Sequence, residues 1–497
     1  MRVDSLSFAN EDLEGSASGQ YANSGAGRGT IDLTAEVTRA DAAQVGRYLP
    51  RGDLMGPRTR AYLAEAIREG EGSYAKLRLR GDLAHFPFKD PALGEFQVTA
   101  HVKKGRFAIG DGWPDLEDID ARLFFERDRM EITGHSARVL GTHLADVKVE
   151  IPAFRVPEIH VLASGQADGA PAEFLRFVEA SPARERIGRF TDGMRAGPGT
   201  GKLSLRMDLP LEGDDGPRLE GEFRFAANTL TVSPELPPIE RAAARISFTE
   251  SAMEVREGHG RLFGGPLTVG GGTRRGGLEF TANGDATLAA LQEVVTHPVA
   301  RSFSGAASYS ALVSVQEGRA RVGIESSLRG VASALPPPFA KRPADALPLR
   351  IQLATAEGGR DRVSVALGAL ARAELLRGPV EGAKAVQRAA VWLSPRGTEP
   401  VRVPERPGLL VYGALDVVEL DTWMALLGPF EQSSGEKKKQ PPPAAWPTVL
   451  DLKVGVLEAY GKRVHDLSLR AGVDPAGWSA SLKAREAAGD VSYRHEG

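Results

Sequence analysis

The chain of 497 residues contains no cysteine, and this absence excludes several kinds of chemistry. Without thiols the protein has no disulfide, no thiolate nucleophile and no zinc site built on sulfur. Long apolar runs are missing too, because no stretch approaches the roughly 18 residues of a membrane-spanning helix. Residues 1–15 also lack the charged, apolar and small-residue pattern of a signal peptide.

An excess of charge of either sign is missing as well. The 62 lysine and arginine residues nearly balance 65 acidic residues, which leaves a net charge of −3 and no basic segment that would indicate nucleic-acid binding. The sequence has no HExxH zinc motif, no G-x-S-x-G nucleophile motif and no carboxylate pair that spacing alone would bring together. We therefore expect a protein that is not an enzyme and has no catalytic residues.

One glycine-rich stretch, AGPGTGKLSL (196–205), resembles a phosphate-binding loop. Such a loop needs G-x-x-x-x-G-K-[ST], because backbone amides hold the phosphates and the hydroxyl holds magnesium. Here Ala196 replaces the first glycine and Leu203 replaces the hydroxyl residue. We interpret the stretch as a turn that leads into a strand.

The dominant pattern in the chain is alternation of apolar and polar residues. Leu77 and Leu79 alternate with basic residues, and Phe96 and Val98 alternate with polar ones. This period of two predicts strands that are apolar on one face and polar on the other. Glycine and proline number 57 and 33, which suits a chain that turns often.

Helical patterns are few and short. We predict them at 56–70, at 171–178, from the N-cap Asp285 onward and from the N-cap Asp421 onward. The last three each follow a strand that carries a glycine, namely Gly165, Gly284 and Gly413.

The sequence contains an internal duplication. Segment 121–141 recurs without a gap 123 residues later as 244–264, and KLRLRGDL (76–83) recurs as KLSLRMDL (202–209). Lys202 therefore corresponds to Lys76, which is the polar first residue of a strand and has no phosphate-loop context.

The duplication also assigns faces to one strand. Leu123 and Phe125 correspond to Ile246 and Phe248, whereas Phe124 corresponds to Ser247. We therefore expect Leu123 and Phe125 to face inward and Phe124 to lie on the outer face.

Metal binding finds little support in the sequence. His135 and His143 lie on successive predicted strands near His101, but His135 corresponds to Gly258 in the second copy. The acidic segment 115–120 lacks the spacing of a calcium loop and is typical of a solvated turn. We predict no metal site and no cofactor.

Segments of the chain resemble, in order, those of the AsmA-like YhdP family of large Gram-negative envelope proteins. The matching segments are RYLP (47–50), LRGDLAHFPF (79–88), GEFQV (94–98), DGWPDLEDIDARLFFE (111–126), ARVLGTHLADVKVEIP (137–152), FLRFVEASP (174–182), LSLRMDLPL (203–211), GLLVYGALDVVELDTWMALL (408–427) and a strand series containing Trp478. Each motif is weak by itself, but their order is fairly specific.

The resemblance implies a mainly β fold: an elongated, twisted, mostly antiparallel sheet curled into an open apolar groove, with few short helices. It implies phospholipid transport between inner and outer membranes, in support of the outer-membrane permeability barrier. The family's N-terminal membrane helix and last C-terminal strands are missing, so we expect a fragment of a longer protein. That protein is expected to be periplasmic, tethered to the inner membrane and monomeric, with phospholipids and both membranes as partners.

On this basis the groove lining is expected to comprise Leu77, Leu79, Phe96, Val98, Leu123, Phe125, Leu203, Leu205, Phe223, Phe225, Ile246 and Phe248. The expected divisions are 1–70 (N-terminal strands and helix), 71–196 (first groove repeat), 197–330 (second groove repeat), 331–430 (AsmA-like strands and short helix), 431–447 (low-complexity loop) and 448–497 (AsmA-like strands). The lysine run within the loop is either solvated or in contact with anionic lipid.

Composition by itself leaves other architectures open. One-sided strands also build a closed sandwich, and a β-rich surface, structural or adhesion module or an uncharacterised sandwich enzyme would share this alternation. A β-solenoid would show a repeat of about 20–30 residues, which is far shorter than the one present.

Overall fold

The computed structural model describes residues 1–23, 25, 27–49, 56–185, 191–211, 216–233, 236–275, 277–294, 298–316, 319–355, 360–380, 383–427, 447–474 and 477–494. The protein is 65% strand and 12% helix, and its 28 described strands belong to one mixed sheet that does not close. These findings confirm the predicted mainly β fold. The low-complexity residues 428–446 lie outside the described part of the chain.

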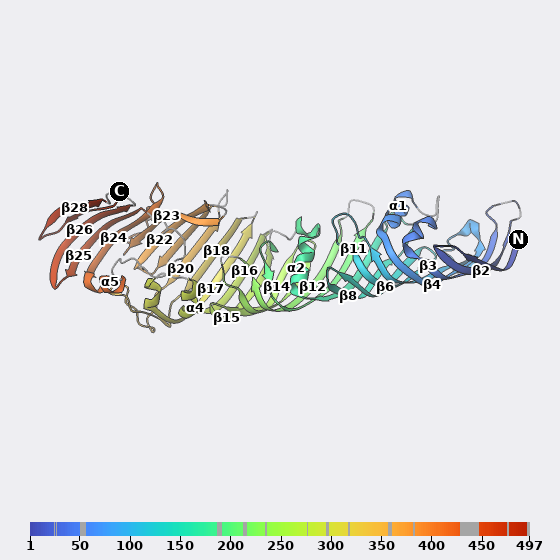
Figure 1. Ribbon diagram of the computed structural model, residues 1–497, viewed down its shortest axis with the longest axis horizontal. Helices are drawn as coiled ribbons and strands as arrows, with labels where there is room; N and C mark the ends of the chain where they lie inside the picture. Colours follow the sequence, from blue (N-terminus) through green and yellow to red (C-terminus); the bar gives the residue numbers. More distant parts are fainter. Residues whose placement is uncertain are drawn as a thin grey trace. The chain divides into compact units, whose positions relative to one another are not determined.

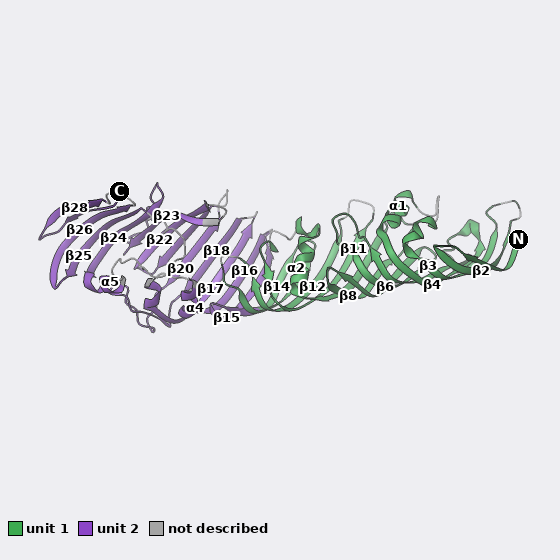
Figure 2. Ribbon diagram, viewed as in Figure 1, with its two compact units in different colours: residues 1–258 green, residues 259–497 purple. Residues whose placement is uncertain are grey.

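The chain divides into two units, residues 1–258 and 259–497, which are described separately (Figure 2).

Unit 1 is an antiparallel ladder in which each strand from β1 to β8 pairs with the next along the chain (Figure 1). Its strands are β1 (Arg2–Ala9), β2 (Leu13–Ala22), β3 (Thr30–Asp41), β4 (Ile67–Asp82), β5 (Gly94–Phe107), β6 (Leu116–Glu126), β7 (Arg129–Val139), β8 (Thr142–Ile151), β9 (His160–Gly169), β10 (Arg195–Ala196), β11 (Gly199–Pro210), β12 (Arg218–Thr231) and β13 (Ile239–Thr249), and β14 (Met253–Leu262) spans the boundary between the units. The short β10 pairs with β12, so β9 pairs directly with β11.

Unit 2 contains two parallel pairings among its described strands, β23 with β24 and β24 with β25. Its strands are β15 (Gly264–Arg274), β16 (Gly277–Thr287), β17 (Phe303–Gln316), β18 (Arg319–Ser326), β19 (Val331–Ser333), β20 (Leu349–Thr355), β21 (Asp361–Leu367), β22 (Ala371–Val380), β23 (Ala383–Leu393), β24 (Gly408–Glu419), β25 (Thr448–Ala459), β26 (Lys462–Asp474), β27 (Gly477–Lys483) and β28 (Ala488–Arg494).

All of the predicted helices are present, in the predicted order. They are α1 (Pro57–Ala66), α2 (Pro171–Glu179), α4 (Leu288–Val294) and α5 (Leu420–Leu427), with 3₁₀ turns at η1 (Ala42–Arg47), η3 (Leu83–His85), η4 (Pro91–Leu93) and η6 (Pro298–Ser302). Among the described residues, no helix combines the length and apolar character needed to cross a membrane.

Two predicted N-caps are wrong. Asp285 lies inside β16, and the hydroxyl of Thr287 instead accepts a hydrogen bond from the amide of Ala290 at 3.3 Å. Asp421 lies within the first turn of α5, and its carboxylate accepts a hydrogen bond from the amide of Tyr460 at 2.8 Å. At Asp285 the strand β16 continues to Thr287, so α4 begins later than predicted; at Asp421 the helix α5 already begins at Leu420, so the aspartate lies inside the helix and its carboxylate serves another element.

The duplication reappears in the backbone. Asp118 and Leu140 of the first copy have positive φ angles of 51° and 49°, and Arg241 and Phe263, each 123 residues later, have φ angles of 46° and 51°. Residues other than glycine rarely adopt this conformation. Shared exceptions at equivalent positions show that the two copies turn in the same way.

Candidate functional site

One face of unit 1 carries an unbroken row of apolar residues, which we call the apolar row of unit 1. Residues that pair across an antiparallel ladder point to the same side of the sheet, so the pairing of the strands defines the row. From β1 to β12 it reads Phe8, Gly15, Val37, Ala75, Ala100, Leu123, Ile132, Val149, Ala163, Met207 and Leu219. Each strand from β1 to β12 except the short β10 contributes an apolar residue or glycine to this row.

The twelve predicted lining residues share this face. Leu77, Val98 and Phe125 lie opposite one another on β4, β5 and β6, beside the row. Leu203 pairs with Phe223, which in turn pairs with Ile246. The others follow in register: Leu79 with Phe96, Leu205 with Gly221 beside Phe248, and Phe225 with Gly201. The register therefore brings all twelve onto one surface, whereas their contact with lipid stays a prediction.

The opposite face is polar. Its corresponding row from β1 to β12 reads Ser7, Ser16, Glu36, Lys76, Thr99, Phe124, Glu131, Glu150, Leu162, Asp208 and Arg218. Phe124 lies on this face as expected, and the Arg129 guanidinium lies 5.8 Å from its ring centroid.

Ion pairs cross the strands on the polar face. Lys76 Nζ lies 3.3 Å from Glu36 Oε1, and Lys148 Nζ lies 3.6 Å from Glu131 Oε2. Arg78 donates to the Asp32 carboxylate, and this hydrogen bond lowers the pKa of Asp32. Such exposed pairs contribute little stability individually. Together they keep this face hydrated.

The described strands belong to one sheet, so among them no second sheet covers the apolar face. None of the twelve residues is fully buried, and all are half-buried. The buried positions on this face include the small residues Ala121, Ala167, Ala227 and Ala242, together with Ile151. Among the residues that the structure describes, Phe88 is the largest fully buried side chain.

The accessible surface of the chain gives the same result. It amounts to 31703 Å², whereas a compact monomer of 53.0 kDa exposes about 18,000 Å². Two compact halves of that mass would together expose about 21,000 Å². The excess therefore does not depend on how the units are placed, and it indicates a sheet that is largely uncovered.

Part of the apolar face is nevertheless covered by α2. The ring of Phe174 on this helix lies 4.7 Å from that of Phe223, and a side chain at Gly201 would meet Phe174 at 2.9 Å. Sequence reasoning identified α2 but missed its contact with Phe223. The apolar stripe of FLRFV in the predicted helix was the available signal.

A second local cover comes from the segment LRGDLAHFPF. Phe86 lies 5.0 Å from Phe96, ring centroid to centroid, and Phe88 packs against Gly81 and Gly94. A Cβ added to Gly94 would lie 2.5 Å from the Phe88 ring, and Gly81 has a φ of 135°. These two glycines, which pair with each other, therefore make room for Phe88.

Unit 2 has an apolar row of its own. From β15 to β28 it reads Val269, Ala282, Ala311, Ile324, Ile351, Val365, Ala373, Val391, Val411, Leu450, Ala471, Ala480 and Val491. The row continues through the parallel pairs without a polar residue. The sequence prediction did not assign lining residues in this unit, although the same alternation was available there.

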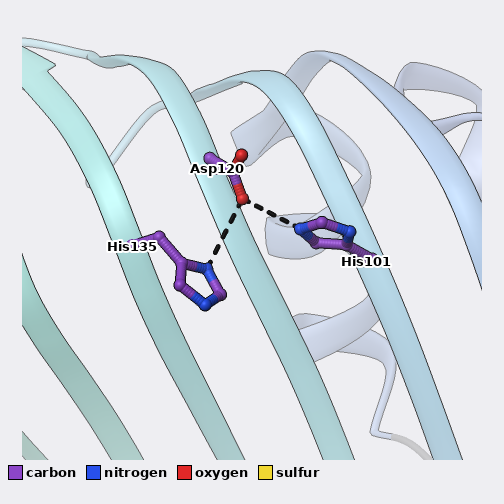
Figure 3. Close-up of side chains that lie close together, drawn as sticks. All are labelled: His101, Asp120 and His135. Carbon is purple, nitrogen blue, oxygen red and sulfur yellow. Dashed lines mark hydrogen bonds and ion pairs between the residues drawn. The ribbon is translucent and has the colours of Figure 1, made fainter.

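The structure brings together two of the three histidines considered for metal binding. His101 and His135 both lie beside Asp120 on the polar face, whereas His143 on β8 pairs with Arg138 and is exposed (Figure 3). The hydrogen bond with His101 is the largest influence on Asp120 and lowers the pKa of its carboxyl.

The suspected phosphate loop is a strand, as predicted. Lys202 lies in β11, its side chain is 76% exposed, and its Nζ lies 3.4 Å from Asp168 Oδ1.

Comparison with known proteins assigns the chain to a family. The family model described as YhdP protein matches residues 1–497. The intermembrane phospholipid transporter YhdP of Escherichia coli (strain K12) is 23% identical over 475 residues, which cover 94% of this chain and 36% of that protein. The chain thus spans about a third of the length of this curated relative. No solved structure matches it. Because the family model covers its whole length, the chain belongs to the YhdP protein family.

Proposed function

We propose that the apolar row of each unit is a surface along which phospholipid acyl chains pass during transfer between the inner and outer membranes. The observation that carries this proposal is the unbroken apolar row of each unit, made mostly of half-buried residues, with no second sheet among the described strands to cover it. An uncovered apolar surface of this extent marks a binding site for an apolar partner. A curved sheet with these rows inside would form the groove expected from the sequence.

The energetics of lipid transfer explain why an unbroken row matters. Exposing an acyl chain to water costs about 0.8 kcal/mol for each CH₂, or on the order of 12 kcal/mol for a sixteen-carbon chain. A polar residue at one position of the row would interrupt the apolar contact at that strand. The rows of both units contain no polar residue, so an acyl chain lying on them keeps apolar contact from strand to strand.

The two faces of unit 1 have different roles in this proposal. The polar face carries charged side chains and ion pairs between strands. Exposing these groups to water costs no desolvation free energy, so this face is stable without a covering layer. The apolar face holds the acyl chains, while the lipid headgroup stays hydrated at the open edge. This division accounts for the strict alternation in the sequence without any catalytic group.

The relative from Escherichia coli supports the choice of cargo, because it is named an intermembrane phospholipid transporter. We infer that this chain acts as part of a longer periplasmic protein that is tethered to the inner membrane, acts as a monomer and supports the outer-membrane permeability barrier. In this role the protein is a transporter with no catalytic activity.

Photocrosslinking at two neighbouring residues tests the proposal. Phe125 lies on the apolar face and Phe124 on the polar face of the same strand. In cells, p-benzoylphenylalanine at position 125 is expected to capture phospholipid on irradiation, and the same group at position 124 is the matched control. Mass spectrometry of the crosslinked protein identifies the lipid. Equal capture at both positions, or capture at neither, would refute the assignment of the apolar face.

A further inference from the structure

Three neighbouring strands of unit 1 each supply one side chain that can bind a metal. His101 comes from β5, Asp120 from β6 and His135 from β7 (Figure 3). His101 Nε2 lies 2.9 Å from Asp120 Oδ1, and His135 Nδ1 lies 3.5 Å from the same oxygen. Ligand atoms bound to one tetrahedral zinc ion at 2.0–2.2 Å are about 3.4 Å apart. The two histidine–aspartate distances therefore lie near the spacing that a shared ion requires, and all three ligand atoms lie within 4.8 Å of one another.

We propose that His101, Asp120 and His135 form a site for one divalent transition-metal ion such as Zn²⁺ or Ni²⁺ on the polar face of unit 1. Two imidazole nitrogens and one carboxylate oxygen suit these ions, whereas Mg²⁺ and Ca²⁺ prefer all-oxygen sites. The His135 side chain is 59% exposed, so water can complete the coordination.

The fold itself does not require these side chains. In the second copy, the positions equivalent to Asp120 and His135 are Ala243 and Gly258, and the same strands form there as β13 and β14. The first copy therefore carries a cluster that the duplicated architecture can omit. Its presence in one copy only is what a local binding function would produce.

The cluster lies where the strand ladder is irregular. The register between β5 and β6 shifts after Val102, and the register between β6 and β7 shifts on both sides of Asp120. Nearby, Asp118 adopts a φ of 51°. Regular inter-strand hydrogen bonds are interrupted here, so an ion bound by one residue from each strand would join β5, β6 and β7 across the interruption.

Calorimetric titration of the purified chain, after treatment with a chelator and its removal, tests the site. Zn²⁺ and Ni²⁺ are expected to bind with one ion per chain, and Mg²⁺ is expected not to bind. Asp120→Asn and His135→Gly should each weaken binding by at least about tenfold, since even indirect changes around a metal commonly cost 10- to 100-fold. His143→Ala, which changes an exposed histidine outside the cluster, should bind as the wild type does.

Thermal unfolding of the same proteins separates loss of the site from loss of the fold. With chelator present, all variants should unfold at the wild-type temperature, and added Zn²⁺ should raise that temperature only for the wild type and His143→Ala. Asp120→Asn preserves shape, so it remains informative if His135→Gly is less stable. The proposal is overturned if the wild type shows no saturable binding, or if Asp120→Asn binds as tightly as the wild type.

Discussion

Leu123 offers the sharpest test of the apolar row, because a substitution there changes the row without touching α2. It lies between Ala100 and Ile132 on the neighbouring strands. Leu123→Glu puts a carboxylate into the path proposed for acyl chains. The matched control is Thr133→Glu on the polar face, where the new carboxylate lies opposite Arg122 and Lys148.

The expected effect can be worked out from burial. Full burial of a leucine contributes about 1.5–3 kcal/mol, and Leu123 is already half-buried without lipid, so acyl contact adds about 1 kcal/mol. Covering an unpaired polar group costs a further 1–3 kcal/mol or so. The summed loss of binding free energy, about 2–4 kcal/mol, corresponds to a drop of about 30- to 700-fold in lipid occupancy at the position of Leu123. A path in series is limited by its least occupied section, so transport should fail.

The assay is complementation of an outer-membrane permeability defect, with each substitution placed in the full-length protein. Leu123→Glu should fail to restore the barrier, while Thr133→Glu should restore it at the same expression level. Thermal unfolding of the purified chains should show similar stability for both, because each side chain remains accessible to water when no lipid is bound. Equal loss from both substitutions, or full function in both, would refute the assignment of faces.

Two further predictions concern the stability of the sheet. Gly94→Ala should lower the free energy of unfolding by about 1–3 kcal/mol, because its Cβ would clash with the Phe88 ring, whereas Gly323→Ala, where nothing lies within 4 Å, should be nearly neutral in denaturant titrations. Arg78→Met should destabilise the protein most above about pH 4. The difference should shrink as the pH falls through the folded-state pKa of Asp32, which lies below its usual value of 3.8; a difference that persists in acid would rule out this pair as its source.

The local pattern of apolar and polar residues predicted the strand faces and the helices of this protein. Strict alternation in a strand places every second residue on one face, so the amino-acid sequence alone separates Leu123 and Phe125 from Phe124. The duplication added a second, independent indication of the same faces. The helices were also found, since each carries a local apolar stripe. The two predicted N-caps were wrong for opposite reasons: β16 runs past Asp285 to Thr287, whereas α5 begins at Leu420, before Asp421.

Contacts between residues far apart in sequence required the tertiary structure. The register between strands decides that His101, Asp120 and His135 meet, and that His143 does not. No single-strand pattern contains that register, because it depends on bulges and turn lengths in several strands at once.

The packing of α2 and the parallel pairing of strands also depend on contacts between residues far apart in sequence. The helix pattern predicts an apolar stripe but not that Phe174 will rest on Phe223, which lies on a strand that comes later in the chain. Likewise β23, β24 and β25 have the same alternation as their antiparallel neighbours, so the pattern of each strand does not distinguish parallel from antiparallel pairing. The sequence alone therefore determines which face of each strand is apolar, and the tertiary structure decides which strands and helices come to share that face.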